Sequence, residues 1–475
     1  MSLTQKTLAE LSHDFQSGNV SSREITEAFI KNIEEKNAEI NAVVTPTFDQ
    51  ALEMADQADA RQKNNALLSP LDGMPITLKD VVCTEGIRTT GCSNIIKNFV
   101  PPYSATVWKK LQSAGAVLLG KVNTDEFTMG SSTETSAFGV TNNPHDLTRV
   151  AGGSSGGSAA SISAEFCTAS VGTDTGGSIR QPAHFCGCTG LKVSYGRVSR
   201  YGVMPMASSL DTIGPLAKTV KDCAMMLQIM AGKDPCDATT PDVPVPDYIF
   251  SLNNSIKGLK IGVPEEYINE GISAETQQAL ETLKKLLSGM GATIEEISLP
   301  HTKYAIPVYY LIAPSEISAN MARFDGVRFG EGFAGKNLKE IYTETRKKGF
   351  GDEVKRRILL GTYALSAGYY DAYYRKAQKV RTLIKQDFEN IFQSYDAIIA
   401  PTSPTPAFEI GENTSDPLKM YMEDVLTIPA SLAGIAGLSI PIQKSAGNLP
   451  IGVQILGPAF SEEKILNIGH QVQSQ

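Results

Sequence analysis

Histidine is scarce in this sequence. The 475 residues contain five histidines, and none of them belongs to the H-E-x-x-H motif of zinc hydrolases. The seven cysteines are odd in number, include no C-x-x-C pair and all lie between Cys83 and Cys236. The thiols are therefore predicted to be reduced and mostly buried. The same scarcity argues against metal-dependent catalysis, and we predict no metal site.

Long apolar runs and blocks of positive charge are also missing. No stretch approaches the roughly 18 consecutive apolar residues of a membrane-spanning helix, and residues 1–6 lack the basic and apolar regions of a signal peptide. We therefore expect a cytoplasmic protein that does not associate with membranes. The net charge of −8 and the short basic clusters, such as Lys355–Arg357, predict weak nucleic-acid binding by this chain.

Glycine and serine, by contrast, are concentrated between Gly152 and Ser178. The stretch opens with Gly-Gly-Ser-Ser-Gly-Gly and closes with Thr-Asp-Thr-Gly-Gly-Ser. Apolar residues 166–171 and 191–193 lie within and just beyond it, which argues against a flexible linker. Backbone of this kind can approach a ligand closely and direct N–H groups outward, so residues 175–178 could form an anion-binding nest.

Lys79 is the candidate base. It directly follows a short predicted strand, Ile76–Leu78, and it is followed by the apolar residues Val81 and Val82. We therefore expect the ammonium group to be buried and its pKa to be lowered. Acyl transfer needs a nucleophile, a base and oxyanion donors. A neutral lysine could deprotonate one serine through another, but the spacing of the residues does not decide which serine attacks.

Segments with the periodicity of strands and helices alternate irregularly along the chain. Apolar strands such as Leu259–Val263 are interspersed with amphipathic helices such as Ala274–Leu287. This order predicts an α/β fold with a mixed central β-sheet covered by helices on both faces. Residues 363–392 form the longest expected helical stretch, and residues 437–442 and 451–456 are expected to pair as a β-hairpin.

Two segments carry a resemblance to a known family. Gly152–Ser158 and Gly172–Ala183 resemble the amidase signature, and the similarity extends to residues 73–80 and 190–215. The resemblance implies one amidase domain over residues 1–475. Its parts are a signature core (70–215), a proline-rich excursion (234–248) and a substrate-side α/β section (250–475). It also implies the amidase signature fold and a triad in which Lys79 is the base, Ser154 a bridging serine reached through a cis peptide, and Ser178 the nucleophile.

Within that family, further segments resemble the glutaminase subunits of glutamyl-tRNA(Gln) amidotransferases. These segments are 208–211, 322–326, 353–358 and 366–374. The resemblance implies hydrolysis of glutamine to glutamate and ammonia through an acyl-enzyme. A partner B subunit would bind ATP and Mg²⁺, contact the tRNA and use the ammonia to amidate Glu-tRNA(Gln). A small C subunit would complete a heterotrimer, and the resemblance does not decide whether Asp-tRNA(Asn) is also used.

The net negative charge of the chain and its lack of a nucleotide-binding loop agree with the binding of tRNA and ATP by a partner subunit. Gly330–Lys336 fits the spacing G-x-x-x-x-G-K, but Asn337 stands where a phosphate-binding loop has serine or threonine. We therefore predict that this chain itself holds no cofactor.

The same resemblance implies a pocket for glutamine. Arg357 would meet the α-carboxylate and Asp424 the α-amine. The remaining residues implied to line the pocket are Gly130, Ser131, Tyr309 and the backbone of Thr175, Gly176 and Gly177.

Two alternatives stay open. A free-standing amidase that acts on small amides would have the same base, bridge and nucleophile, and only Arg357 and Asp424 argue against it. The second alternative is a catalytically inactive scaffold. Against it, we predict that Ser178→Ala abolishes activity and acylation.

Overall fold

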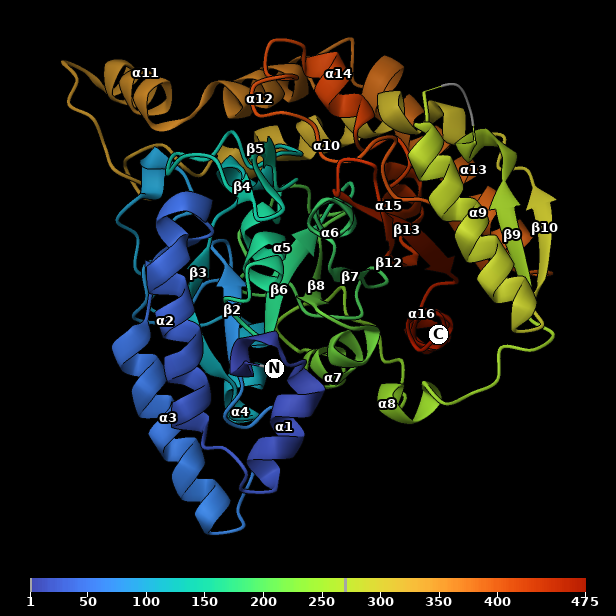
Figure 1. The fold of residues 1–475 in the computed structure, drawn as a ribbon. Helices are drawn as coiled ribbons and strands as arrows, with labels where there is room; N and C mark the ends of the chain where they lie inside the picture. Colours follow the sequence, from blue (N-terminus) through green and yellow to red (C-terminus); the bar gives the residue numbers. More distant parts are fainter. Residues whose placement is uncertain (1, 269–270) are drawn as a thin grey trace.

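The computed structural model describes residues 2–268 and 271–475, and the strands of these residues form one large sheet and one small hairpin (Figure 1). The small hairpin pairs β4 (Asn142–Asn143) with β5 (Asp146–Val150). The large sheet has eleven strands among the described residues, in the order β1 (Val43–Pro46), β3 (Val117–Val122), β2 (Pro75–Lys79), β6 (Ala169–Asp174), β8 (Thr212–Ala217), β7 (Thr189–Lys192), β12 (Ala436–Lys444), β13 (Pro450–Gly457), β11 (Ala397–Pro401), β9 (Lys260–Pro264) and β10 (Thr293–Ile297).

The large sheet is mixed, as the alternation of elements predicts. Strands β2, β3 and β6 are parallel neighbours, and so are β9, β10 and β11, whereas the strands between these groups pair antiparallel. Strand β11 is buried on both faces. Ala397 and Ile399 pack in one hydrophobic core, while Ile398 packs in a second core on the opposite face.

Helices cover both faces of the sheet, which confirms the predicted layers (Figure 1). Helices α10, α12, α13 and α15 supply one core, and α1–α5, α7, α9 and α16 contribute to the other. The helices are α1 (Leu8–Gln16), α2 (Ser22–Ile40), α3 (Phe48–Lys63), α4 (Thr106–Ser113), α5 (Gly156–Ser163), α6 (Arg180–Cys186), α7 (Val220–Met230), α8 (Tyr248–Ser251), α9 (Ala274–Gly289), α10 (Ala305–Met321), α11 (Leu338–Gly349), α12 (Asp352–Ala364), α13 (Lys376–Ile391), α14 (Pro417–Met422), α15 (Ile428–Ala433) and α16 (Glu462–Gln473).

The predicted hairpin forms, and the predicted long helical stretch forms with an interruption near its start. Strands β12 and β13 pair antiparallel across residues 445–449. The stretch 363–392 is interrupted, because α12 ends at Ala364 and Gly368 adopts a left-handed conformation with φ of 86°. A π-helical turn at Asp371–Arg375 then leads into α13. Gly368 lies in the turn between the two helices, four residues after α12 ends, and glycine adopts its left-handed conformation without steric cost.

The seven cysteines form no disulfide, and six of them are buried, in agreement with the prediction of reduced thiols. Among the described residues, the structure contains no helix with the length and apolar character needed to cross a membrane.

Candidate active site

Lys79 lies at the end of β2 and is completely buried. Because β2 and β6 are parallel neighbours, their carboxyl ends meet at one edge of the sheet. The Lys79 Nζ is 2.8 Å from Ser154 Oγ, 2.8 Å from Ser155 Oγ and 2.9 Å from Thr173 Oγ1. Burial lowers the pKa of Lys79 to about 7, although the nearby carboxylates of Asp125 and Asp174 act in the opposite direction. A neutral amine has a lone pair that can accept a hydroxyl proton, so Lys79 can serve as a base.

Ser154 follows a cis peptide bond between Gly153 and Ser154, as the resemblance implies. The backbone here is held by Gln181, whose Oε1 accepts the Gly153 N–H at 3.0 Å. Gly153 also packs against a buried carboxylate, because a Cβ at this position would lie 2.2 Å from Asp125 Oδ2. Gly130 approaches the same carboxylate as closely. The Asp125 carboxylate therefore lies against both the loop that precedes Ser131 and the turn that presents Ser154.

Ser178 lies between β6 and α6, as the last residue of the predicted anion-binding nest, Thr175–Ser178. The N–H groups of Thr175–Ser178 donate no hydrogen bond to any described residue, so they are available to a ligand. The Ser155 N–H donates to the Ser178 carbonyl at 3.1 Å, which joins the two serine segments. Among the described residues, Ser178 Oγ has no hydrogen-bond partner, and it is not bonded to Ser154 Oγ. Hydrogen bonds of this kind often tighten only when substrate is bound.

The nest is also fixed from the C-terminal half of the chain. Thr427 Oγ1 donates to the Gly176 carbonyl at 2.7 Å. A Cβ at Gly177 would lie 2.2 Å from the same hydroxyl, and a Cβ at Gly176 would lie 2.9 Å from the Tyr309 Oη. Glycine is therefore required at both positions, and the Tyr309 ring lies against the nest.

Arg357 lies on α12 and is only 4% exposed. Its Nε donates to Glu353 Oε1 at 2.7 Å, and its guanidinium carbon is 5.7 Å from the ring centres of both Tyr310 and Tyr421. Burial alone would lower the pKa of Arg357, but the Glu353 carboxylate raises it, and the net shift is upward. The Nη1 and Nη2 groups donate no hydrogen bond to any described residue. A buried cation with unused donors is a site for an anion.

Asp424 provides the complementary group just after α14. One carboxylate oxygen, Oδ2, accepts the Ser131 hydroxyl at 2.5 Å, and the other, Oδ1, is buried without a hydrogen-bond partner among the described residues. Burial raises the pKa of Asp424 to about 7, and Ser131 acts in the opposite direction. Burial also raises the pKa of Tyr309. The charge of Arg357 acts against this rise, and the charge of Asp424 adds to it, so the net shift is upward. Tyr309 therefore lies within electrostatic range of both a cationic and an anionic group.

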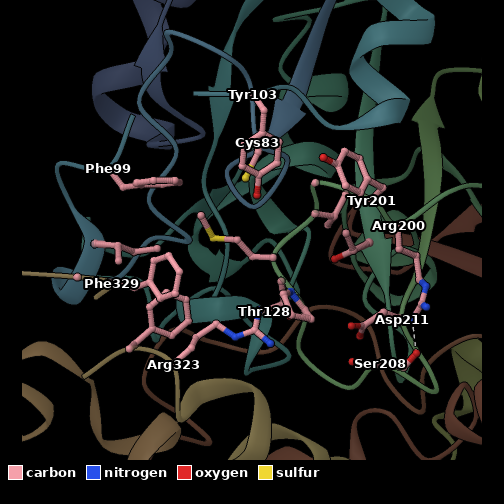
Figure 2. Close-up of a pocket in the computed structure, with 18 of the residues that line it drawn as sticks. Cys83, Phe99, Tyr103, Thr128, Arg200, Tyr201, Ser208, Asp211, Arg323 and Phe329 are labelled. Atoms are coloured by element: carbon pink, nitrogen blue, oxygen red, sulfur yellow. Dashed lines mark hydrogen bonds between the residues drawn. The ribbon is translucent and has the colours of Figure 1, made fainter. Parts of the chain in front are cut away.

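A cavity of about 700 Å³ lies beside this site, and its lining includes neither Lys79, Ser154 and Ser178 nor Arg357 and Asp424. Its lining includes Thr173, which contacts Lys79, and Asp211, which accepts the Thr175 hydroxyl at 2.7 Å. Figure 2 shows Phe99 and Phe329 across this cavity from Asp211. The cavity therefore meets the site only through Thr173 and Asp211, one residue removed from Lys79 and from Thr175.

The structure brings some of the predicted residues into contact and others only into the same region. Lys79 contacts Ser154 directly, and Ser178 is joined to this pair through the backbone of Ser155. Ser131 contacts Asp424, and Tyr309 lies against Gly176, whereas no hydrogen bond joins Arg357 to Asp424 among the described residues. For the predicted pocket of Gly130, Ser131, Tyr309, Arg357, Asp424 and the backbone of Thr175–Gly177, which we call the clamp, binding of glutamine stays a prediction.

Sequence reasoning missed four contributors. Ser155 and Thr173 contact Lys79, and Glu353 and Tyr421 contact Arg357. Ser155 and Thr173 belong to the predicted glycine-serine stretch, and Glu353 begins the segment 353–358 that carries the resemblance, whereas no local pattern distinguishes Tyr421.

Comparison with known proteins gives a consistent result. The family model described as Amidase matches residues 24–466. The chain is 54% identical over 471 residues to the A-type subunit of the glutamyl-tRNA(Gln) amidotransferase of Geobacter metallireducens, covering 99% of this chain and 97% of that protein. It is 53% identical to the protein of the same description from Geobacillus thermodenitrificans, with the same shares covered.

Solved structures agree with the sequence comparison. The crystal structure of the A-type subunit of glutamyl-tRNA(Gln) amidotransferase from Thermotoga maritima is 39% identical and matches with a TM-score of 0.82 over 100% of this chain and 96% of that chain. The native peptide amidase of Stenotrophomonas maltophilia is 26% identical, with a TM-score of 0.83 over 99% of this chain and 96% of that chain. The chain therefore belongs to the amidase family, and within it to the group of A-type subunits of glutamyl-tRNA(Gln) amidotransferases.

Proposed function

We propose that this chain is the glutaminase subunit of a tRNA-dependent amidotransferase. It hydrolyses glutamine to glutamate and ammonia, and it supplies the ammonia to a partner subunit. The observation that carries the proposal is the pair of complementary groups in the clamp. The unused Arg357 donors fit an α-carboxylate, and the unpartnered Asp424 oxygen fits an α-ammonium. A simple amide has neither group.

The chemistry follows from the relay and the nest. Neutral Lys79 takes the proton of Ser154, which takes that of Ser178, and Ser178 Oγ attacks the γ-carbonyl carbon of glutamine. The nest N–H groups of residues 175–178 stabilise the oxyanion. As the C–N bond breaks, the relay returns a proton to the nitrogen, which leaves as ammonia. Water then attacks the glutamyl ester through the same relay and releases glutamate.

We further propose that the amidation of tRNA takes place elsewhere, in a heterotrimer with a B subunit and a small C subunit in the cytoplasm. ATP and Mg²⁺ would bind to the B subunit, which would also contact the tRNA. The segment Gly330–Lys336 does not fit a phosphate loop, because no strand precedes it. Asn337 caps α11 by accepting the Glu340 N–H at 3.0 Å. The net charge of −8 likewise favours tRNA contact by a partner.

Substrate choice and one substitution test the proposal. Ammonia release would be measured with glutamine and with a simple aliphatic amide, using the full chain alone and co-expressed with its partner subunits. We expect a strong preference for glutamine. Ser178→Ala should lower the rate by about a thousandfold or more without changing the melting temperature. Ser163→Ala, which changes a serine at the end of α5, is the matched control and should retain the wild-type rate.

Two results would contradict the proposal. Rapid hydrolysis of simple amides with no turnover of glutamine would indicate a free-standing amidase. A near-normal glutaminase rate in Ser178→Ala would mean that Ser178 is not the nucleophile.

A further inference from the structure

Glu353 occupies a central position behind the amino-acid clamp. It lies one helical turn before Arg357 on α12 and is 12% exposed. Its Oε1 accepts two hydrogen bonds, from Arg357 Nε at 2.7 Å and from the Tyr421 hydroxyl at 3.1 Å. Its Oε2 accepts a hydrogen bond from Nη1 of the exposed Arg356. Ion pairs at this helical spacing are usually exposed, but the Glu353–Arg357 pair is buried, and Tyr421 from another element joins it.

The contact with Glu353 decides which edge of the guanidinium is free. A guanidinium can bind a carboxylate through Nε and one Nη, or through its two terminal nitrogens. Glu353 engages Nε, so the remaining edge, Nη1 and Nη2, is left for the α-carboxylate of the substrate. The rings of Tyr310 and Tyr421 are both within 5.7 Å of the guanidinium carbon and restrict its rotation.

Tyr421 connects this arrangement to the other end of the clamp. It lies on α14, three residues before Asp424, and its carbonyl accepts the Asp424 N–H at 3.4 Å. Its ring is stacked on Tyr310, with centroids 3.8 Å apart and planes inclined by 21°. Glu353 therefore contacts the carboxylate-binding residue directly and the ammonium-binding segment through a single tyrosine hydroxyl.

We propose that Glu353 is a positioning residue that, with the Tyr421 hydroxyl, fixes the spacing between Arg357 and Asp424. By holding the two ends of the clamp at the separation of an α-carboxylate and an α-ammonium, the pair selects free amino-acid amides over other amides. This inference rests on the proposed glutaminase function.

Two substitutions of similar size test the inference. Glu353→Gln keeps the shape of the side chain but removes its charge, and Tyr421→Phe keeps the stacked ring but removes the hydroxyl. Arg356→Gln, which removes the exposed partner of the same carboxylate, is the matched control. The substrates are glutamine and 4-aminobutanamide, which lacks only the α-carboxylate. The second compound is used as a competitive inhibitor where its turnover is slow. All variants are measured as full chains in the partner complex, after their melting temperatures have been compared.

We expect Glu353→Gln and Tyr421→Phe each to raise KM for glutamine by about tenfold, the size of one lost charge-assisted hydrogen bond. Values of kcat should stay within about threefold of the wild type, because the relay is untouched. The affinity for 4-aminobutanamide should not change, and Arg356→Gln should behave as the wild type for both compounds.

The inference and the proposed function fail in different ways. A wild-type complex that does not hydrolyse glutamine contradicts the function itself. If the wild type is active and either Glu353→Gln or Tyr421→Phe keeps the wild-type KM for glutamine, Glu353 and Tyr421 do not fix the spacing between Arg357 and Asp424. An equal loss of affinity for glutamine and for 4-aminobutanamide would indicate general damage to the fold and would also overturn the inference.

Discussion

Burial moves the pKa values of Lys79 and Asp424 in opposite directions, and both end near 7. For Lys79 burial disfavours the ammonium, and for Asp424 it disfavours the carboxylate. The proposed mechanism needs a neutral lysine and an ionised aspartate. Both required forms therefore predominate above pH 7 and are lost as the pH falls below it.

This leads to a prediction for the pH dependence of glutamine hydrolysis. The kcat/KM reports the free enzyme, so its acid limb should contain two ionisations near pH 7. The kcat reports the substrate complex, in which the α-ammonium keeps Asp424 ionised, so one ionisation should remain, that of Lys79. Asp424→Asn should raise KM by about 10- to 100-fold and remove one ionisation from the kcat/KM profile. Stopped ammonia assays over pH 5–9 would test this, and an unchanged profile in Asp424→Asn would refute the assignment.

At the scale of residues, the sequence predicts the catalytic groups better than the residues that position them. Lys79 is recognisable by its apolar neighbours, and Ser154 and Ser178 by the surrounding glycines. Glu353 and Tyr421 are 68 positions apart and lie on separate helices. Their hydrogen bond depends on how α12 and α14 pack, which no short-range pattern encodes.

At the scale of elements, the position of Arg357 depends on a close contact between α10 and α12. A Cβ at Gly361 would lie 1.8 Å from the carbonyl oxygen of Pro314, which is located inside α10. The two helix backbones are therefore in direct contact one turn beyond Arg357, and only glycine fits at this point. The carbonyl belongs to the backbone and cannot move aside as a side chain can.

Gly361→Ala should therefore push α12 away from α10. We expect a loss of about 1–3 kcal/mol in the free energy of unfolding, the usual cost of overpacking, and a higher KM for glutamine because Arg357 moves with its helix. Gly289→Ala is the control. No atom lies within 4 Å of a Cβ at Gly289, at the end of α9, and helix propensity there favours alanine. Urea unfolding and glutaminase kinetics would measure both effects, and equal stability of the two variants would contradict the argument.

The interruption of the predicted helix over residues 363–392 illustrates the same limit for elements. The β12–β13 hairpin is predictable because alternating apolar residues flank a short turn. The amphipathic pattern around Gly368 does not reveal a break, because a glycine can be tolerated inside a helix or can end one. In the structure the break falls at residues 365–370, around this glycine.

At the scale of the whole molecule, Arg180 connects the nucleophile segment with the C-terminal strands. It forms a fully buried ion pair with Asp174, with Nε and Oδ2 3.1 Å apart. Its terminal nitrogens also donate to Gln454 Oε1 at 2.9 Å, to the Thr427 carbonyl at 3.0 Å and to Ser431 Oγ at 3.0 Å. The order of strands that permits these contacts places β12 beside β7, more than 240 residues apart in the sequence. Long-range pairing of this kind was not predicted.

The Asp174–Arg180 pair should make a large contribution to stability that depends on pH. Burial alone would raise the pKa of Asp174, but the charge and hydrogen bonds of Arg180 lower it below 3.8. A carboxyl whose pKa is lower in the folded than in the unfolded state stabilises the fold above the unfolded value. That stabilisation is lost as the pH falls through the folded value. The wild type should therefore keep this contribution at neutral pH and lose it only in strong acid.

Arg180→Met should cost about 3–5 kcal/mol at neutral pH, because it leaves Asp174 buried without its partner. The variant should recover part of this loss on mild acidification, where Asp174 can become protonated. Asp174→Asn in the same chain should likewise recover part of it at neutral pH. Arg375→Met, which removes an exposed pair with Asp371, is the control and should cost about 1 kcal/mol or less. Urea unfolding at several pH values would measure these differences, and equal losses in the two arginine variants would show that the buried pair does not hold the halves of the sheet together.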